Sequence, residues 1–121
     1  MTNFKPPLAY AAALFGITLA GTVHANSSNG TNDVVSVGIH DSGHAMITLA
    51  SSSNVEGCSR PDLRNVVLIP KTNPNFKAMY ATALLALSTG RPITGWVNGC
   101  TDVWGDGGTV VATATTLGIS R

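Results

Sequence analysis

Residues 65 to 100 read NVVLIPKTNPNFKAMYATALLALSTGRPITGWVNGC, and the order of elements in this stretch decides the fold. It opens on a short, continuously apolar run, Asn65–Ile69, which is typical of a strand buried on both faces and ends at Pro70. Thr72-Asn73-Pro74 then offers a capping side chain followed by a proline, and Gly90 stands just past the last periodic residue. The stretch therefore predicts a strand followed by a helix over Asn75–Thr89.

The predicted helix is apolar on more than one side. One stripe at helical spacing is expected to face the core, with Leu84 fully buried. That stripe is Phe76, Met79, Tyr80, Ala83, Leu84 and Leu87. The opposite side carries Ala78, Ala81, Leu85 and Ala86, where a helix on a monomer surface usually carries more charge. Either the helix is enclosed inside the domain, or Ala78, Ala81 and Leu85 form a face that meets another copy of the chain.

Four further strands are expected on either side of this stretch. Asp41-Ser42-Gly43 has turn composition and joins the first two of them as a hairpin. The four are Val34–Ile39, His44–Ala50, Ile93–Asn98 and Thr109–Thr116. The resulting order, β-β-β-α-β-β, is that of the OB-fold, a small five-stranded, partly open barrel. The chain is thus predicted to be mainly β with one helix (α+β), and alternation along Ile93–Asn98 favours a core or half-buried place for Trp96.

The first 25 residues have the pattern of a secretory signal peptide. Lys5 precedes an uncharged run, Leu8–Val23, and Val23-His24-Ala25 supplies a small-x-Ala ending. The alternative is a membrane anchor, but this run is shorter than the roughly 20 strongly apolar residues that a span needs. We expect cleavage after Ala25, a flexible polar lead-in over residues 26–32, and a single domain over residues 33–121. The mature protein is then secreted or periplasmic, with no membrane span.

Charge and cysteine content narrow the class of protein further. Only 11% of the residues are charged and the formal net charge is +1, which argues against nucleic acid as a partner. Once Lys5 leaves with the leader, six basic residues balance six acidic ones, so little repulsion opposes self-association. Cys58 and Cys100 are the only cysteines, and in an oxidising compartment such a pair predicts one disulfide.

Few residues suggest catalysis or metal binding. His40, Asp41 and His44 could contribute to a metal site, but they straddle a predicted turn, and ordinary turn residues are the favoured interpretation. Asp102 and Asp106 could act as paired carboxylates, yet aspartate is common in glycine-rich turns for local hydrogen bonding. We expect a protein that is not an enzyme and that has no cofactor and no metal.

Trp104 is the strongest candidate for contact with a ligand. It lies between Asp102 and Asp106, and an aromatic face beside carboxylates suits a sugar, whose hydroxyls need acceptors. Arg64 and Arg91 are the basic candidates for an anionic glycan, or they are solvated surface charges. The alternative for Trp104 is that it fills one end of the barrel.

The stretch from residue 65 to residue 100, with VVLI, NPNFKAMYATALLALSTGRPI and WVNGC, resembles a group of small exported bacterial proteins. It is similar to the B subunits of AB5 toxins of the subtilase-cytotoxin and pertussis-like typhoid-toxin type. The resemblance implies an OB-fold, pairing of Cys58 with Cys100, and the helix Asn75–Thr89 with a turn at Gly90. It also implies a homo-oligomer in the form of a ring pentamer, binding of cell-surface glycans that are often sialylated, and an A-type subunit as partner.

Two classes of function follow from these observations. The first is an exported binding module, a glycan-binding B-subunit-like protein of an AB5-type assembly. The alternative is a periplasmic or secreted structural or accessory protein that has the same fold and no sugar ligand.

Overall fold

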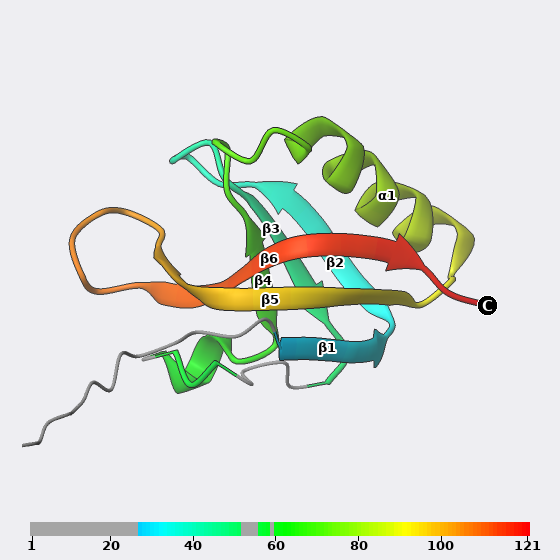
Figure 1. Cartoon of the computed structure of the whole chain (residues 1–121), viewed down its shortest axis with the longest axis horizontal. Coiled ribbons are helices and arrows are strands. Elements are labelled where there is room, and N and C mark those ends of the chain that lie inside the picture. The colour runs from blue at the N-terminus through cyan, green and yellow to red at the C-terminus, as the bar shows by residue number, and fades with distance from the viewer. Residues whose placement is uncertain (1–26, 52–55, 59) are drawn as a thin grey trace, which may run out of the picture.

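The computed structural model describes residues 27–51, 56–58 and 60–121, and in this part the chain is mainly β with one helix (Figure 1). The predicted signal peptide lies outside the described residues. The elements, in chain order, are β1 (Ser27–Asn32), β2 (Val34–Ile39), β3 (Ala45–Leu49), a 3-10 turn (Pro61–Leu63), β4 (Val66–Ile69), α1 (Phe76–Thr89), β5 (Ile93–Asp102) and β6 (Val110–Ile119).

All six strands belong to one sheet in the order β1-β5-β6-β4-β3-β2, and only the β4–β6 pair is parallel. The prediction of a five-stranded barrel is corrected on two counts. The sheet has six strands, and it does not close, because β1 and β2 form its two edges. These edge strands pair with β5 and β3 respectively, although only Asp33 separates them in the chain.

The additional strand β1 occupies the segment for which the composition predicts a flexible lead-in. Its backbone pairs with β5 from Ser27 opposite Val97 to Asn32 opposite Ile93, with an irregularity between Ser28 and Thr31. Asn29 and Asn32 are buried, and the Asn32 side-chain amide donates to the Asn29 carbonyl at 2.9 Å. A neighbouring strand thus imposes extended structure on residues whose own propensity is for turns.

The core lies between the concave side of the sheet and α1. Ala45, Ile47 and Leu49 point inward from β3, and every residue of β4 is buried, as its continuously apolar run predicts. The helix packs against β6 and β2 and covers this side of the sheet (Figure 1). It ends before Gly90, as predicted, and Gly90 adopts the left-handed conformation with φ of 69°.

The phase of the helix differs from the predicted one. Met79, Ala83 and Ala86 are its buried residues, whereas Leu84 is 40% exposed and Leu87 is also exposed. The two alanines have small side chains, so the helix can approach the sheet closely along them and leave the leucines at its flanks. Leu84 is therefore not the fully buried residue that the periodicity predicts, and Ala86 lies on the buried side. Ala78, Ala81 and Leu85 are exposed.

One disulfide joins Cys58 to Cys100, as predicted, and ties the segment before the 3-10 turn to β5. Glu56 reinforces this connection, because its carboxylate accepts a hydrogen bond from the Gly99 backbone N–H at 2.7 Å and another from the Ser27 hydroxyl. The start of β1, the middle of β5 and the segment around Cys58 are thereby held together. None of the helices in the described part of the chain is both long and apolar enough to cross a lipid bilayer.

Candidate functional site

The predicted candidates Asp102, Trp104 and Asp106 lie together in the loop between β5 and β6. The Asp102 carboxylate accepts hydrogen bonds from the backbone N–H groups of Gly105, at 3.1 Å, and Gly107. The Asp106 carboxylate accepts one from the N–H of Gly108 at 2.8 Å. Both carboxylates thus hold the conformation of the loop, which is the local bonding expected of aspartate in a glycine-rich turn.

Trp104 does not fill the end of the sheet structure, because its side chain is 53% exposed. The neighbouring Val103 is buried instead and packs with Leu68 and Val111. The Trp104 ring meets the ring of His40, from the β2–β3 turn, edge to face, with centroids 4.1 Å apart. Two loops distant in sequence therefore meet at this aromatic pair.

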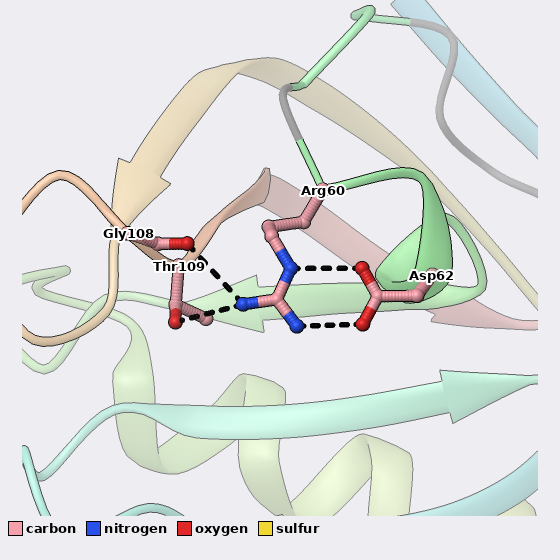
Figure 2. A network of polar contacts seen from close by, with 4 residues as sticks. All are labelled: Arg60, Asp62, Gly108 and Thr109. Carbon is pink, nitrogen blue, oxygen red and sulfur yellow. Dashed lines mark hydrogen bonds and ion pairs between the residues drawn. The ribbon is translucent and has the colours of Figure 1, made fainter.

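The Arg60 side chain also stabilises this loop, through contacts that are not evident from the sequence and that we call the Arg60 brace. The Arg60 guanidinium forms a bidentate ion pair with Asp62, with hydrogen bonds of 2.8 and 2.6 Å (Figure 2). Its remaining terminal nitrogen donates to the Gly108 carbonyl and the Thr109 hydroxyl, each at 3.2 Å. The hydrogen bond from Arg60 lowers the pKa of Asp62, and the same bond raises the pKa of Arg60. The predicted ligand candidate Arg64 follows the 3-10 turn and is exposed.

The two histidines of the β2–β3 turn take part in local hydrogen bonding. The His40 Nδ1 accepts from the Ser42 N–H at 3.1 Å, and the His44 Nδ1 accepts from the Lys71 N–H at 3.0 Å. Partial burial lowers the pKa of His44, and the nearby charges of Lys71 and His40 lower it further. Across residues 27–51, 56–58 and 60–121, no group of three or more histidine, cysteine or acidic side chains could hold a metal ion.

A second candidate site lies on the outer face of β1, β5 and β6. It is a shallow groove of about 370 Å³, which we call the Trp96 groove. Trp96 is 48% exposed, so of the two predicted places it takes the half-buried one and does not lie in the core. The alternation of β5 turns Ile93, Gly95 and Val97 inward and Trp96 outward. The groove is lined by Ser28, Gly30, Thr31, Thr94, Gly95, Trp96, Thr116, Leu117 and Gly118.

The strand register arranges the lining of the Trp96 groove in two rows. In the first, Trp96 is opposite Ser28 on one side and Thr116 on the other. In the second, Thr94 is opposite Thr31 and Gly118. The rows lie two residues apart along β5, or about 6.6 Å. Because Gly118 has no side chain, the second row leaves a hollow next to the indole.

Gly95 fixes the close approach of β5 to β6 beneath this groove. A Cβ atom at this position would lie 2.5 Å from the Thr116 carbonyl oxygen, so a larger residue would push the two strands apart. A Cβ atom at Gly118, by contrast, would meet only the Thr94 hydroxyl at 3.6 Å, an ordinary contact. The two glycines therefore have different roles: Gly95 is needed for packing, and Gly118 leaves the groove open.

No protein-family model, curated protein or solved structure matches this chain. The assignment of a function therefore rests on the fold and on these two surfaces. They belong to a small, disulfide-bonded, mainly β domain with one exposed tryptophan on a strand and another on a loop.

Proposed function

We propose that this protein is an exported glycan-binding module and that the Trp96 groove is its binding site. The observation that carries the proposal is the half-exposed indole of Trp96 in a concave surface lined by hydroxyl groups. Small-molecule sites commonly combine an aromatic or apolar wall with a few polar groups that fix the orientation of the ligand.

The chemistry of the Trp96 groove suits a pyranose ring. The C–H face of a sugar stacks on the indole, while its hydroxyl groups exchange hydrogen bonds with Ser28, Thr94 and Thr116. Each of these hydroxyls can both donate and accept, so the groove can adapt to sugar hydroxyls of either polarity. The strand backbone of β5, paired on both sides, holds Trp96 in place before a ligand arrives.

The connectivity supports an OB-like arrangement within the six-stranded sheet. β2, β3 and β4 form a meander, α1 follows β4, and β6 pairs with both β4 and β5. The order of these elements is the one on which the predicted OB-fold rests, with β1 added at one edge. OB-fold domains include binders of oligosaccharides, which is consistent with the proposed function.

Export is part of the proposal. The Cys58–Cys100 disulfide is of the kind that persists in oxidising compartments, and residues 1–25 have the sequence pattern of a cleaved leader. We place the mature protein in the periplasm or outside the cell. Intact mass of the exported protein tests this, because it should lack residues 1–25 and show no thiol that reacts before reduction.

Self-association in a ring, with an A-type subunit as partner, belongs to the same proposal. It is supported by the largely apolar outer side of α1, where Ala78, Ala81 and Leu85 are exposed together with Leu84 and Leu87, and where Lys77 is the one charged residue of the helix. Light scattering at micromolar concentration should give a mass larger than that of the monomer, and Ala81→Glu should reduce it. A monomeric wild type would exclude the ring, and an oligomer that survives Ala81→Glu would place the interface elsewhere.

A glycan array probed with the mature protein tests the binding function. Trp96→Ala should abolish the signal, whereas Trp104→Ala is the matched control, since it removes an indole of similar exposure from a different surface. Circular dichroism establishes that both variants are folded. If the array shows no bound glycan, the alternative of a structural or accessory protein with the same fold is favoured. If only Trp104→Ala loses the signal, the loop between β5 and β6 is the site.

A further inference from the structure

We infer that the Trp96 groove takes a neutral pyranose and discriminates against sialylated and other anionic glycans. This inference rests on the proposed function and names the class of sugar. It departs from the sialylated ligands that the sequence resemblance implies.

The lining of the groove carries no charge. Its residues contribute hydroxyls, glycine backbone, one indole and one leucine, and none of them is lysine, arginine or histidine. A carboxylate that leaves water for a protein surface needs a cation or several N–H donors to replace its hydration. Residues 52–55 and 59 are Ser-Ser-Asn-Val and Ser, so the side chains of these two segments add no cation either.

Glu56 is not among the lining residues of the groove. Its carboxylate accepts hydrogen bonds from Ser27 and Gly99. Ser27 is opposite the inward-facing Val97, whereas Ser28 is opposite the outward-facing Trp96, so the Ser27 side chain projects on the face of the sheet away from the groove.

Two arginines flank the paired ends of β5 and β6, outside the lining of the groove: Arg91 precedes β5, and Arg121 follows β6. β5 starts at Ile93, which pairs with Ile119 at the end of β6, and Ser120 N–H donates to the Pro92 carbonyl at 2.8 Å. Arg91 and Arg121 come directly beyond this pair and are exposed. They are the side-chain cations that an anionic glycan would have to reach, so variants at these two positions show whether such a glycan binds through them.

Gly118 provides a variant that changes the groove and spares the fold. A side chain at this position projects on the same face as its cross-strand partner Thr94, next to the indole. A Cβ atom at this position would meet only the Thr94 hydroxyl, at an ordinary contact distance of 3.6 Å. Gly118→Val should therefore fill the hollow, while Gly38→Val is the matched control, because a Cβ atom at Gly38 on edge strand β2 meets no atom within 4 Å.

The experiment is a titration of the mature protein with neutral and anionic sugars, monitored by Trp fluorescence and by calorimetry. The neutral members are methyl glycosides of galactose, glucose, mannose and N-acetylglucosamine and the disaccharide lactose, and the anionic members are 3′- and 6′-sialyllactose. At least one neutral sugar should bind, and sialylation should weaken binding by about tenfold or more. Gly118→Val should weaken binding by about tenfold or more while Gly38→Val leaves it unchanged. Raising the salt concentration should leave the neutral affinity unchanged, because no ion pair forms.

The possible results separate the inference from the proposed function. If the sialylated sugars bind more tightly and Arg91→Ala or Arg121→Ala removes that advantage, the inference fails and the glycan-binding function stands. If neutral sugars bind but Gly118→Val has no effect, the ligand lies outside the Trp96 groove and the inference also fails. If neither these sugars nor the array gives binding, both fail together.

Discussion

The two tryptophans of the chain have similar exposure but are held in different ways. Trp96 lies on β5, whose backbone is paired with β1 and β6 on its two sides. Trp104 lies on a loop that is held by hydrogen bonds from backbone N–H groups to Asp102 and Asp106 and by the Arg60 brace. Cys100 is four residues from each of them along the chain.

This difference shows which polar groups remain available for a ligand. On the loop, the carboxylates already bind their own backbone, so they are partly used before any sugar arrives. On the sheet, backbone pairing does most of the structural work. The Ser28 hydroxyl accepts the Gly30 backbone N–H at 3.1 Å but keeps its own O–H to donate, and Thr94 and Thr116 line the groove with further hydroxyls. The strand site is thus the better binding surface, although the loop has the more conspicuous residues. The following predictions test this contrast, with fluorescence of Trp96 and Trp104 read separately in Trp104→Phe and Trp96→Phe backgrounds.

Removal of the disulfide should cause the largest loss of unfolding free energy. It should affect the surroundings of both tryptophans alike. The Cys58–Cys100 bond spans a sequence separation of 42 residues, and a loop of this length contributes about 4 kcal/mol in the chain-entropy model. The double variant Cys58→Ser, Cys100→Ser should lose about this free energy of unfolding in urea denaturation, and both indoles should report one transition. A loss below about 1 kcal/mol, or two separate transitions, would contradict this expectation.

Truncation of Met79 should cause the second-largest loss of stability. It should disturb the surroundings of Trp96 rather than those of Trp104. Met79 is 6% exposed and borders a hollow between α1 and β6 that Thr116 and Leu117 also line. The last two residues line the Trp96 groove as well, so the helix supports the groove from behind. Met79→Ala should cost about 2–5 kcal/mol, the range for a buried side chain.

Leu84→Ala is the matched comparison on the same helix. Because Leu84 is 40% exposed, its truncation should cost clearly less than that of Met79, and Lys77→Ala should lie within about 0.5 kcal/mol of the wild type. Equal losses for Met79 and Leu84 in urea denaturation would mean that the helix is packed in another phase.

The helix also shows how far the sequence predicts this fold. Periodicity and capping predict its existence, its approximate start at Phe76 and its end at Gly90, and strand patterns predict the five strands from β2 onward. Its phase could not be predicted, because alanines weigh little in a hydrophobic pattern. The close approach of Ala83 and Ala86 to the sheet nevertheless buries them and leaves Leu84 exposed. Strand β1 was missed for a related reason, since pairing with β5 forms it and its own polar residues do not favour it.

The candidate sites divide in the same way. Asp102, Trp104 and Asp106 are neighbours in the chain, so their grouping is visible in the sequence. The Trp96 groove combines Ser28, Thr94, Trp96 and Gly118, which come from three separated strands. Its existence depends on strand register, which the pattern of a single strand does not specify. Strict alternation of β5 was the available signal, since it places Trp96 on the face opposite Ile93 and Val97.

Loss of the Arg60 brace should affect Trp104 alone. Arg60 and Asp62 are exposed enough that their ion pair adds little to global stability, so Arg60→Ala should leave the free energy of unfolding nearly unchanged. The contacts to Gly108 and Thr109 disappear, and the loop gains freedom. Acrylamide quenching of Trp104 should increase while that of Trp96 stays the same. Arg91→Ala is the control, and a change in Trp96 quenching in the Arg60 variant would show that the two surfaces are coupled.

The smallest effect should be a pH dependence that arises at His44. Its Nδ1 accepts the Lys71 N–H, and protonation would turn this acceptor into a donor and break the bond. The pKa of His44 is lowered in the folded protein, so the unfolded chain binds the proton more tightly and stability rises with pH. The contribution of neutral His44 is therefore complete above the unfolded pKa of about 6.5 and is lost as the pH falls below it.

In His44→Asn an amide oxygen can replace the acceptor and does not titrate, so urea denaturation should show a smaller loss of stability between pH 7.5 and pH 5.5 than in the wild type. His44 shares its turn with His40, which contacts Trp104, so the same pH change should alter Trp104 emission more than Trp96 emission. Equal changes in the two emissions would show that the turn does not act locally on the loop.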